Sequence, residues 1–227
     1  MEPIMELRNI TFSYNGRNPV FKNVNMRLEG NGVHFVVGPN GAGKTTLLKI
    51  IGLLYRPTGG ELRLWNENPW KDGDLLTRLR RKIVYVHEKP ILLRGNVLQN
   101  LLYPLTKIRG IDEKEALSRV KKISDYMGIN DLIQRDVRSL SAGQAHLIAV
   151  ARAVSLNPDI LLLDEPFSHL DTEKKKLLAA MIREEGSKKL VIIATHDTYL
   201  ASKIGDRFII LENGRVETLD RIDLTMI

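Results

Sequence analysis

Apolar and polar side chains alternate in the first part of the chain. The alternation is weak over residues 4–10 and clearer over residues 21–28, and a segment rich in Asn, Gly and Pro separates the two. Alternation of this kind predicts strands with one buried face, joined here by a turn at residues 14–19. A further strand is expected at residues 61–65, after the turn at residues 57–60.

Longer apolar runs have a different pattern. Residues 34–37, 83–86, 160–163, 190–194 and 208–211 are almost continuously apolar. Strands buried on both faces have this composition, and such strands are typical of a parallel sheet covered by helices. These runs predict an α/β core.

The stretch from residue 89 to 155 has helical periodicity. Apolar residues recur at spacings of three and four within residues 97–102, 113–127 and 142–155. A helical stretch between two strand-rich parts predicts an inserted lobe. We therefore expect one domain over residues 1–227, in which residues 1–88 and 156–227 form the core with its antiparallel strands and residues 89–155 form a helical subdomain.

Composition excludes several classes of protein. The 227 residues include no cysteine, so disulfides and thiolate metal sites are excluded. Nowhere do 18 apolar residues follow one another, so no membrane-spanning segment is expected. The net charge of +7 raises the possibility of nucleic-acid binding, but the Lys and Arg residues are scattered, and we expect no nucleic-acid partner.

A glycine-rich segment follows the first buried run and precedes a predicted helix start. It fits the pattern G-x-x-x-x-G-K-[ST]. Its glycines let backbone N–H groups converge on one point, and the following helix directs its positive end there, so the segment predicts a phosphate-binding loop. Lys44 is expected on the β- and γ-phosphates, and the Thr45 hydroxyl on Mg²⁺. The alternative is a glycine-rich turn that fits by chance. The loop residues are Gly38, Pro39, Asn40, Gly41, Ala42, Gly43, Lys44, Thr45 and Thr46.

Polar residues follow two of the buried strands. Asp164 and Glu165 end the run at residues 160–163, and His196 follows the run at residues 190–194. Ligands bind at the carboxyl ends of strands in such sheets. Asp164 is therefore a candidate Mg²⁺ ligand, Glu165 a general base for an attacking water, and His196 a donor to the γ-phosphate. The alternatives are exposed strand-end carboxylates and a structural histidine.

Two further features bear on nucleotide binding. Ser141, Ala142, Gly143 and Gln144 precede the last helical run, where a cap hydroxyl and free N–H groups make a second anion-binding device. It lies in the helical lobe, so a second chain would have to bring it to a phosphate loop. Tyr14, at the tip of the first strand pair, is a candidate to stack on an adenine ring or a packing aromatic.

Together these segments resemble the ATP-binding subunits of ATP-binding cassette (ABC) transporters. The phosphate loop, Leu-Ser-Ala-Gly-Gln at residues 140–144, Asp164-Glu165-Pro166, Ser-His-Leu-Asp at residues 168–171 and His196 occur in that family's order and spacing. The resemblance covers nearly the whole chain. It implies a P-loop NTPase (RecA-like) α/β core with an antiparallel β subdomain and an inserted helical signature subdomain, and an ATPase that uses ATP and Mg²⁺.

The resemblance also implies partners. It predicts a head-to-tail dimer, expected to be a homodimer, with each ATP between one subunit's phosphate loop and the other's residues 141–144. Tyr14 matches the adenine-stacking aromatic, Glu165 the general base, His196 the switch histidine, and Asp171 the loop that couples the two sites. Integral-membrane permease subunits are expected partners at the cytoplasmic face of the cell membrane, and an extracytoplasmic solute-binding protein is an open further partner.

The chain departs from the family pattern at two single positions and at one pair of residues. Ala142 replaces a glycine, and Glu88 stands where the family has a glutamine that touches Mg²⁺ and the attacking water, so Glu88 is an expected Mg²⁺ contact with added negative charge. His146-Leu147 replaces a Gln-Arg pair.

The subfamily and the physiological setting leave choices open. Residues 89–97, 103–105 and 109–110 look like importer ATPases for oxyanions such as tungstate, molybdate, phosphate or sulfate. A nucleic-acid-repair ATPase would need a long coiled coil, and a ribosome-acting ATPase usually has two cassettes in one chain. A soluble ATPase without a permease, such as an iron–sulfur cluster assembly scaffold, remains the alternative.

Overall fold

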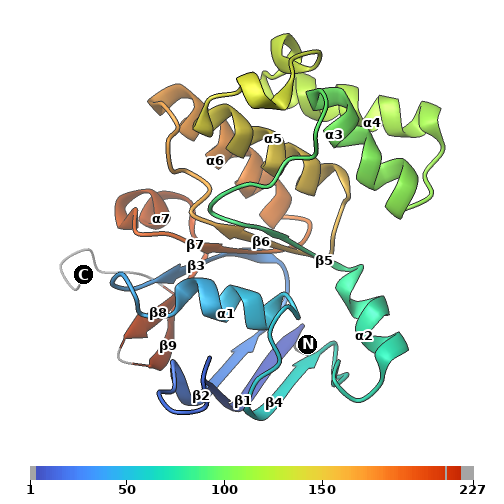
Figure 1. Ribbon diagram of the computed structural model, residues 1–227. Helices are drawn as coiled ribbons and strands as arrows, with labels where there is room; N and C mark the ends of the chain where they lie inside the picture. Colours follow the sequence, from blue (N-terminus) through green and yellow to red (C-terminus); the bar gives the residue numbers. More distant parts are fainter. Residues whose placement is uncertain (1–3, 213, 221–227) are drawn as a thin grey trace. The chain divides into compact units, whose positions relative to one another are not determined.

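The computed structural model describes residues 4–212 and 214–220. Contacts divide the chain into two compact units. The first unit draws on Met1–Tyr85, Asp159–Asp164 and Ile182–Ile227, and the second on Val86–Pro158 and Glu165–Met181. The first is rich in strands and the second is helical (Figure 1).

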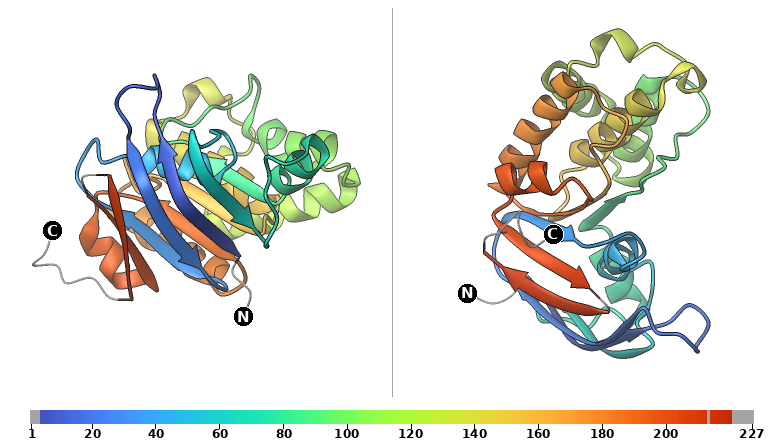
Figure 2. Two further views of the ribbon diagram at one scale, coloured as in Figure 1. Left: turned by 90° about the horizontal axis from the view of Figure 1, so that it is seen from below. Right: turned by 90° about the vertical axis from the view of Figure 1, so that its left-hand side faces the viewer.

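The alternating segments form a three-stranded antiparallel sheet in the first unit. Its order is β2 (Phe21–Leu28), β1 (Met5–Phe12) and β4 (Gly59–Leu64), and Figure 2 shows the three strands side by side. The buried positions in β2 are its four apolar residues. The predicted bounds of β2 are confirmed. Its alternating burial is typical of a sheet with one face packed on the core and the other in solvent.

The continuous apolar runs form a six-stranded sheet. Its order is β5 (Ile83–Val86), β6 (Ile160–Asp164), β7 (Leu190–Ala194), β3 (Gly32–Val37), β8 (Arg207–Glu212) and β9 (Arg215–Leu219). β3 pairs in parallel with β7 and β8, β6 pairs in parallel with β7, and only β9 is shown antiparallel to its neighbour. Every residue of β3, β6 and β7 is buried. Because β3, β6 and β7 run in parallel, their carboxyl ends lie at the same edge of the sheet.

A single apolar core holds the first unit together. Helix α1 (Lys44–Ile51) contributes Leu47, Leu48, Ile50 and Ile51, all fully buried, to a cluster that contains residues of both sheets. Two short helices, α2 (Gly73–Arg80) and α7 (Thr198–Ile204), were not expected from periodicity, because two turns give too few positions to show it. The core fixes α1, and with it the loop before α1.

The second unit is built from capped helices. Its elements are α3 (Val97–Tyr103), a π-helical turn (Pro104–Ile108), α4 (Glu113–Met127), two 3₁₀ turns (Asn130–Leu132 and Val137–Ser139) and α5 (Ala142–Ser155). The predicted bounds of α4 and α5 are confirmed. The Asp112 side chain caps α4 at one end, and Gly128, with φ of 61°, ends it at the other.

Helix α6 (Thr172–Gly186) begins in the second unit and ends in the first. The second unit therefore holds Glu165–Met181 as well as residues 86–158, whereas the sequence led us to expect residues 89–155 alone. The packing explains the difference, because a Cβ on Gly143 of α5 would overlap the backbone carbonyl of His169. Among the described residues, no helix is long and apolar enough to cross a bilayer.

Candidate nucleotide site

The predicted phosphate loop connects β3 to α1 and is shaped by glycines. Gly41 and Gly43 have φ of 81° and 100°, in the left-handed region that other residues avoid. A Cβ on Gly38 would overlap the carbonyl oxygen of Leu211 in β8. Gly43 occupies the N-cap of α1 without any side-chain cap, so the first-turn N–H groups remain able to bind an anion.

Lys44 lies within this loop. Its side chain is largely buried, and its Nζ donates to the carbonyl oxygens of Gly38 at 2.8 Å and Pro39 at 3.1 Å. Both acceptors belong to the loop itself, so the ammonium group is held beside the backbone groups expected to bind phosphate. Lysine binds phosphate as a compact charge, and this position suits that role.

Three side chains meet at the carboxyl end of β6. The Thr45 hydroxyl donates to Asp164 Oδ1 at 3.1 Å, and the Tyr85 hydroxyl donates to Asp164 Oδ2 at 2.9 Å. Asp164 is 2% exposed. Sequence reasoning missed Tyr85; the available signal was an aromatic residue near the end of β5, the strand beside β6.

These donors fit a magnesium ion. Mg²⁺ takes oxygen ligands and is usually bound by one or two protein groups together with substrate phosphates. Thr45 and Asp164 supply one hydroxyl and one carboxylate. In the described parts of the chain, no group of three or more His, Asp or Glu side chains converges as a metal site.

Tyr14 lies next to the loop. Its hydroxyl shares a hydrogen bond with Thr46 Oγ1 at 2.7 Å, and its ring is nearly perpendicular to those of Phe12 and Tyr55, with centroids 5.1 and 5.8 Å away. The side chain is still 61% exposed. Tyr14 thus packs as an aromatic neighbour and keeps exposed surface on which a base could stack.

His196 lines a cavity with the phosphate loop. The cavity has a volume of about 470 Å³, and the imidazole follows directly after β7, whose partner strands end at the same edge. The first unit therefore brings together the predicted loop, Tyr14, Asp164 and His196. The cavity is lined by Val37, Gly38, Pro39, Asn40, His196, Thr198, Ile210, Leu211 and Glu212.

The second predicted anion-binding element begins α5 in the helical unit. Ser141 is its N-cap: the Gln144 N–H donates to Ser141 Oγ at 3.2 Å, and the Ser141 N–H donates to Gln144 Oε1 at 3.0 Å. This reciprocal capping box satisfies two backbone donors. Ala142 and Gly143 follow within the first helical turn.

Two other predicted residues also group with the helical unit. Glu165 has φ of 48°, and its carbonyl accepts hydrogen bonds from the Ser168 N–H and hydroxyl. A non-glycine residue in this conformation stores strain, as residues at functional sites often do. Asp171 accepts from the backbone N–H and the ammonium of Lys174, and these bonds lower the pKa of its carboxyl group.

Two departures from the family pattern influence one another. His146 is 1% exposed, and neither ring nitrogen has a hydrogen-bond partner among the described residues. Burial and, to a smaller extent, His169 lower the pKa of His146 to about 4, against the opposing effect of the exposed Glu88 carboxylate. Sequence reasoning noted Glu88 and His146 separately and gave no sign that they interact.

Comparison with known protein families shows to which family the chain belongs. The ABC transporter family matches residues 21–168, which run from β2 through the phosphate loop and the α5 N-terminus to beyond Glu165. The chain belongs to the ABC transporter family. It is an ATP-binding ATPase subunit of that family, and the predicted P-loop NTPase fold with its antiparallel and helical parts is confirmed.

Relatives of this ABC ATPase include transport subunits. The tungstate uptake ATP-binding protein TupC of Peptoclostridium acidaminophilum is 33% identical over 214 residues, covering 93% of this chain and 96% of the relative. The methionine import ATP-binding protein MetN of Francisella tularensis subsp. holarctica is 32% identical over 225 residues. The ABC ATPase described here spans 64% of that relative's length.

Solved structures of ABC ATPases have the same fold. The ATP-binding cassette MJ0796, a dimer bound to ADP and Pi, superposes with a TM-score of 0.84 at 32% identity and covers 97% of this chain and 100% of that one. CbiO1 of Clostridium perfringens is part of the transporter complex CbiONQ, and it also superposes with a TM-score of 0.84. The sequence identity is 27%, and the match covers 97% of this chain and 89% of the CbiO1 chain.

Proposed function

We propose that this ABC ATPase powers a solute importer as a head-to-tail homodimer with two composite ATP sites. The observation that carries the proposal is the presence of two anion-binding helix starts, at α1 and α5, in separate units of one chain. The dimeric cassette among the similar structures supports it.

The first unit would bind ATP and the metal. The N–H groups of residues 38–46 and the Lys44 ammonium hold the β- and γ-phosphates, while Tyr14 stacks on adenine. Thr45 and Asp164 would hold Mg²⁺, and Glu88 would contact it from the helical unit. When bound, Mg²⁺ neutralises charge that develops on the phosphate oxygens.

Hydrolysis would depend on two side chains. Glu165 accepts a proton from the water that attacks the γ-phosphorus, and the positive φ at this residue holds its backbone in a sparsely populated conformation. His196, on the loop after β7, donates a hydrogen bond to the γ-phosphate and so orients it for in-line attack.

The partner subunit would complete each site. The segment Ser141, Ala142, Gly143 and Gln144 of the second copy would bind the γ-phosphate through the N–H groups of Ala142 and Gly143 and the Ser141 hydroxyl, because the other two N–H groups are held in the capping box. Asp171 would lie in the loop that couples the two sites. ATP then closes the dimer and hydrolysis reopens it. A symmetric pair of sites follows from the two-fold symmetry of a homodimer.

The similarity to a tungstate uptake ATPase supports an importer of oxyanions. The methionine importer among the relatives shows that similar cassettes serve other solutes. The membrane subunits, and a solute-binding protein outside the membrane, would select the solute.

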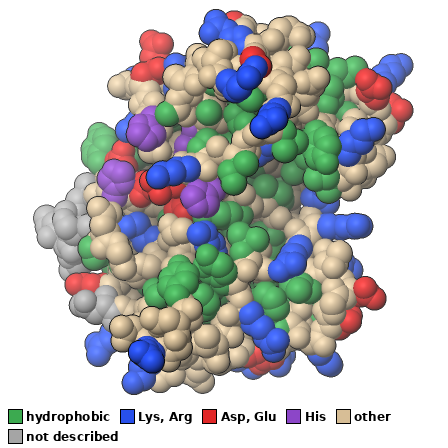
Figure 3. Space-filling model, viewed as in Figure 1, with side chains coloured by type: hydrophobic (Ala, Val, Ile, Leu, Met, Phe, Trp, Pro, Cys, Tyr) green, Lys and Arg blue, Asp and Glu red, His purple; other side chains and the backbone are tan. Residues whose placement is uncertain are grey.

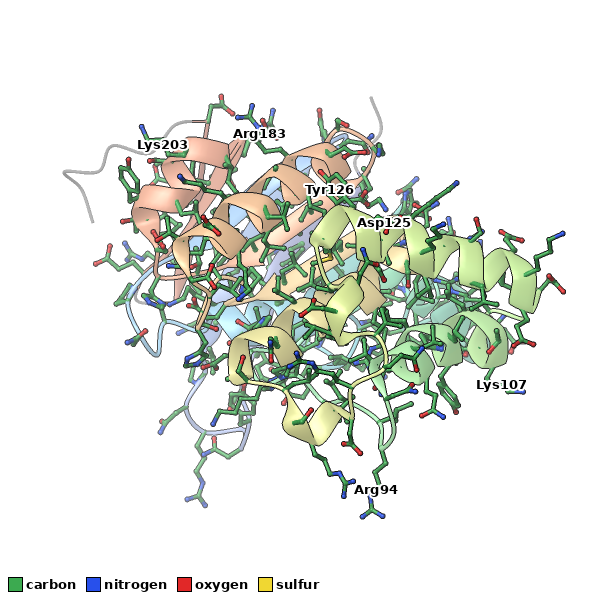
Figure 4. The ribbon with its side chains drawn as sticks, turned by 90° about the horizontal axis from the view of Figure 1, so that it is seen from above. Arg94, Lys107, Asp125, Tyr126, Arg183 and Lys203 are labelled. Carbon is green, nitrogen blue, oxygen red and sulfur yellow. The ribbon has the colours of Figure 1, made fainter. Side chains whose placement is uncertain are left out.

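A surface on the helical unit would receive the permease at the cytoplasmic face of the membrane. Ile91, Leu93, Tyr103 and Ile108 are 77%, 44%, 48% and 62% exposed. Figure 3 shows hydrophobic side chains exposed over α3, and in Figure 4 the nearby cations Arg94 and Lys107 point away from the ribbon. Exposed apolar residues with cations beside them fit a protein partner near anionic lipid headgroups.

The test is the oligomeric state of Glu165→Gln with and without Mg·ATP, by light scattering during size exclusion. We expect turnover to fall at least about 100-fold, because a general base is lost, and ATP to convert monomer into dimer. Glu113→Gln, at an exposed position on α4, is the matched control and should hydrolyse ATP at the unmodified rate.

The opposite results would be equally clear. Undiminished hydrolysis by Glu165→Gln would remove this residue from the role of base. A monomer that binds ATP and stays a monomer would overturn the homodimer, and would direct the search to a different cassette subunit or to the permease.

A further inference from the structure

Residues 89–95, which we call the docking loop, are held by a buried asparagine. The Asn100 side chain in α3 is fully buried; its Nδ2 donates to the carbonyl of Leu93 at 2.9 Å, and its Oδ1 accepts from the Leu93 N–H at 2.7 Å. One amide therefore satisfies both backbone groups of Leu93. A paired, buried amide of this kind fixes the local backbone, because leaving either group unpaired costs free energy.

A second anchor reaches the docking loop from α5. Arg152 Nη2 donates to the carbonyl of Ile91 at 2.8 Å, across 61 positions in the sequence. Burial of the guanidinium lowers the pKa of Arg152. Within the described parts of the chain, Ile91 supplies the sole hydrogen-bond acceptor for this side chain. Arg152 is half-buried and the bond is exposed to solvent, so water can satisfy its other N–H groups while Ile91 fixes the position of this one.

The two anchors turn the loop's backbone inward and leave its apolar side chains outside. Ile91 is 77% exposed although its carbonyl is bonded to α5, and Leu93 is 44% exposed although its peptide groups are bonded to α3. The apolar side chains are thus presented on an ordered backbone. Such preorganisation favours docking, because less conformational entropy is lost when the partner binds.

Helix α5 connects this loop to the residues expected to contact ATP. It begins after Ser141 and contains Arg152 in its last turn. Its 14 residues span about 21 Å as a single helix. A displacement of the Ser141 end on ATP binding would therefore carry Arg152 with it.

We propose that Arg152 is a positioning residue that couples the signature helix α5 to the docking loop, and that Asn100 fixes the shape of the loop. The proposal rests on the proposed function. In this role Arg152 contacts neither ATP nor the attacking water. It transmits the position of α5 to the surface that receives the permease.

Amide hydrogen exchange on the intact chain tests the coupling. In the Glu165→Gln background we expect Mg·ATP to alter exchange over residues 91–96. Adding Arg152→Met should abolish this response while ATP still forms the dimer, and without ATP the Leu93 amide should exchange about tenfold faster, since loss of a charged hydrogen bond loosens the loop. Arg152→Lys, which keeps a donor and the charge, should restore part of the response.

Arg138→Met is the matched control. Arg138 pairs with Asp136 on the surface and is 84% exposed, so its loss should leave the response unchanged. An ATP response of residues 91–96 that survives Arg152→Met would overturn the proposal. If Arg152→Met does not fold, Arg152→Gln, which removes the charge, takes its place, and an unchanged response there combined with an unchanged Leu93 exchange rate would do the same.

The experiment separates this proposal from the proposed function. If Glu165→Gln forms no dimer with ATP, the homodimer fails. The Leu93 exchange rate without ATP then still reports whether Arg152 holds the loop, and an unaltered rate in Arg152→Met would overturn the positioning role.

Discussion

The starts of α1 and α5, which we propose as the two anion-binding elements, are built in different ways. Helix α1 begins at Gly43, in a left-handed conformation and without a side-chain cap. Helix α5 begins at Ser141, where a complete capping box satisfies the backbone donors of Ser141 and Gln144. The first start leaves its N–H groups for a ligand, whereas the second is stabilised by its own side chains.

This difference predicts separate roles for the two helix starts: the start of α1 binds ATP, and the start of α5 responds to ATP bound by a second copy. A loop that depends on a ligand for its hydrogen bonds gains stability when the ligand arrives, and should bind ATP within one subunit. In the self-capped helix start the Ser141 hydroxyl accepts from the Gln144 N–H and keeps its own proton to donate to a phosphate, but the N–H groups of Ser141 and Gln144 are already occupied. This start should therefore engage weakly, and only when a second copy brings the phosphate close.

The largest expected effect comes from Gly38→Ala. The new Cβ would overlap the backbone carbonyl of Leu211, which cannot move without shifting β8, so we expect about 3 kcal/mol of lost stability and loss of ATP binding. Urea unfolding measures the loss of stability, and nucleotide titration measures the loss of ATP binding. In Gly41→Ala, where φ is 81° but no atom lies within 4 Å, the cost should be about 1 kcal/mol. Equal losses would show that the close contact with β8 is unimportant.

Acid should weaken both units by a similar mechanism. Burial lowers the pKa of His34, in the strand before the phosphate loop, to about 4, aided by Arg207 and opposed by Asp206. Burial also lowers the pKa of His146, in α5, to about 4. Since the unfolded chain takes up these protons first, stability is complete above pH 6.5 and falls between 6.5 and 4, by at most about 3 kcal/mol per histidine.

His34→Gln and His146→Gln separate the two contributions. Each should flatten the dependence of unfolding free energy on pH between 6.5 and 4, as measured by urea titration at several pH values. A slope that neither substitution reduces would mean that other groups dominate acid unfolding.

The smallest expected effect comes from Ser141→Ala. Loss of the cap should cost about 1 kcal/mol of stability, and Asp112→Ala, which removes the cap of α4, should cost a similar amount. Only Ser141→Ala should also weaken ATP-dependent dimerisation in the Glu165→Gln background, as measured by light scattering. If Ser141→Ala and Asp112→Ala had the same effect on ATP-dependent dimerisation, Ser141 would serve only to cap its helix.

Sequence patterns predicted the strands whose burial is complete and the helices α4 and α5, but they missed the equally long helix α6. The bounds of β7, α4 and α5 follow directly from apolar periodicity. The π-helical turn at Pro104–Ile108 could not be predicted in this way, because five residues show no period. The assignment of Glu165–Met181 to the helical unit depends on close packing at Gly143, which sequence does not reveal.

Short motifs that carry their own geometry made parts of the candidate site visible in the sequence. The loop Gly38–Lys44 is shaped by its own glycines, and Asp164 was noted from its place at the end of a buried strand. Tyr85 and Arg152 escaped prediction because their partners, a carboxylate 79 positions away and a carbonyl 61 positions away, are chosen by the fold. In addition, every residue has a backbone carbonyl, so the amino-acid sequence does not indicate which carbonyl will accept a hydrogen bond.

The bonds from Lys44 to its own loop bear on the thermodynamics of nucleotide binding. Because the ammonium already occupies Gly38 and Pro39 carbonyls, the ordering of the loop is completed when the chain folds. Arrival of a phosphate is then an exchange of acceptors, with little chain entropy to lose. Affinity for the triphosphate should therefore track its charge more closely than the flexibility of the loop, and diphosphate should compete in proportion to the contacts it retains.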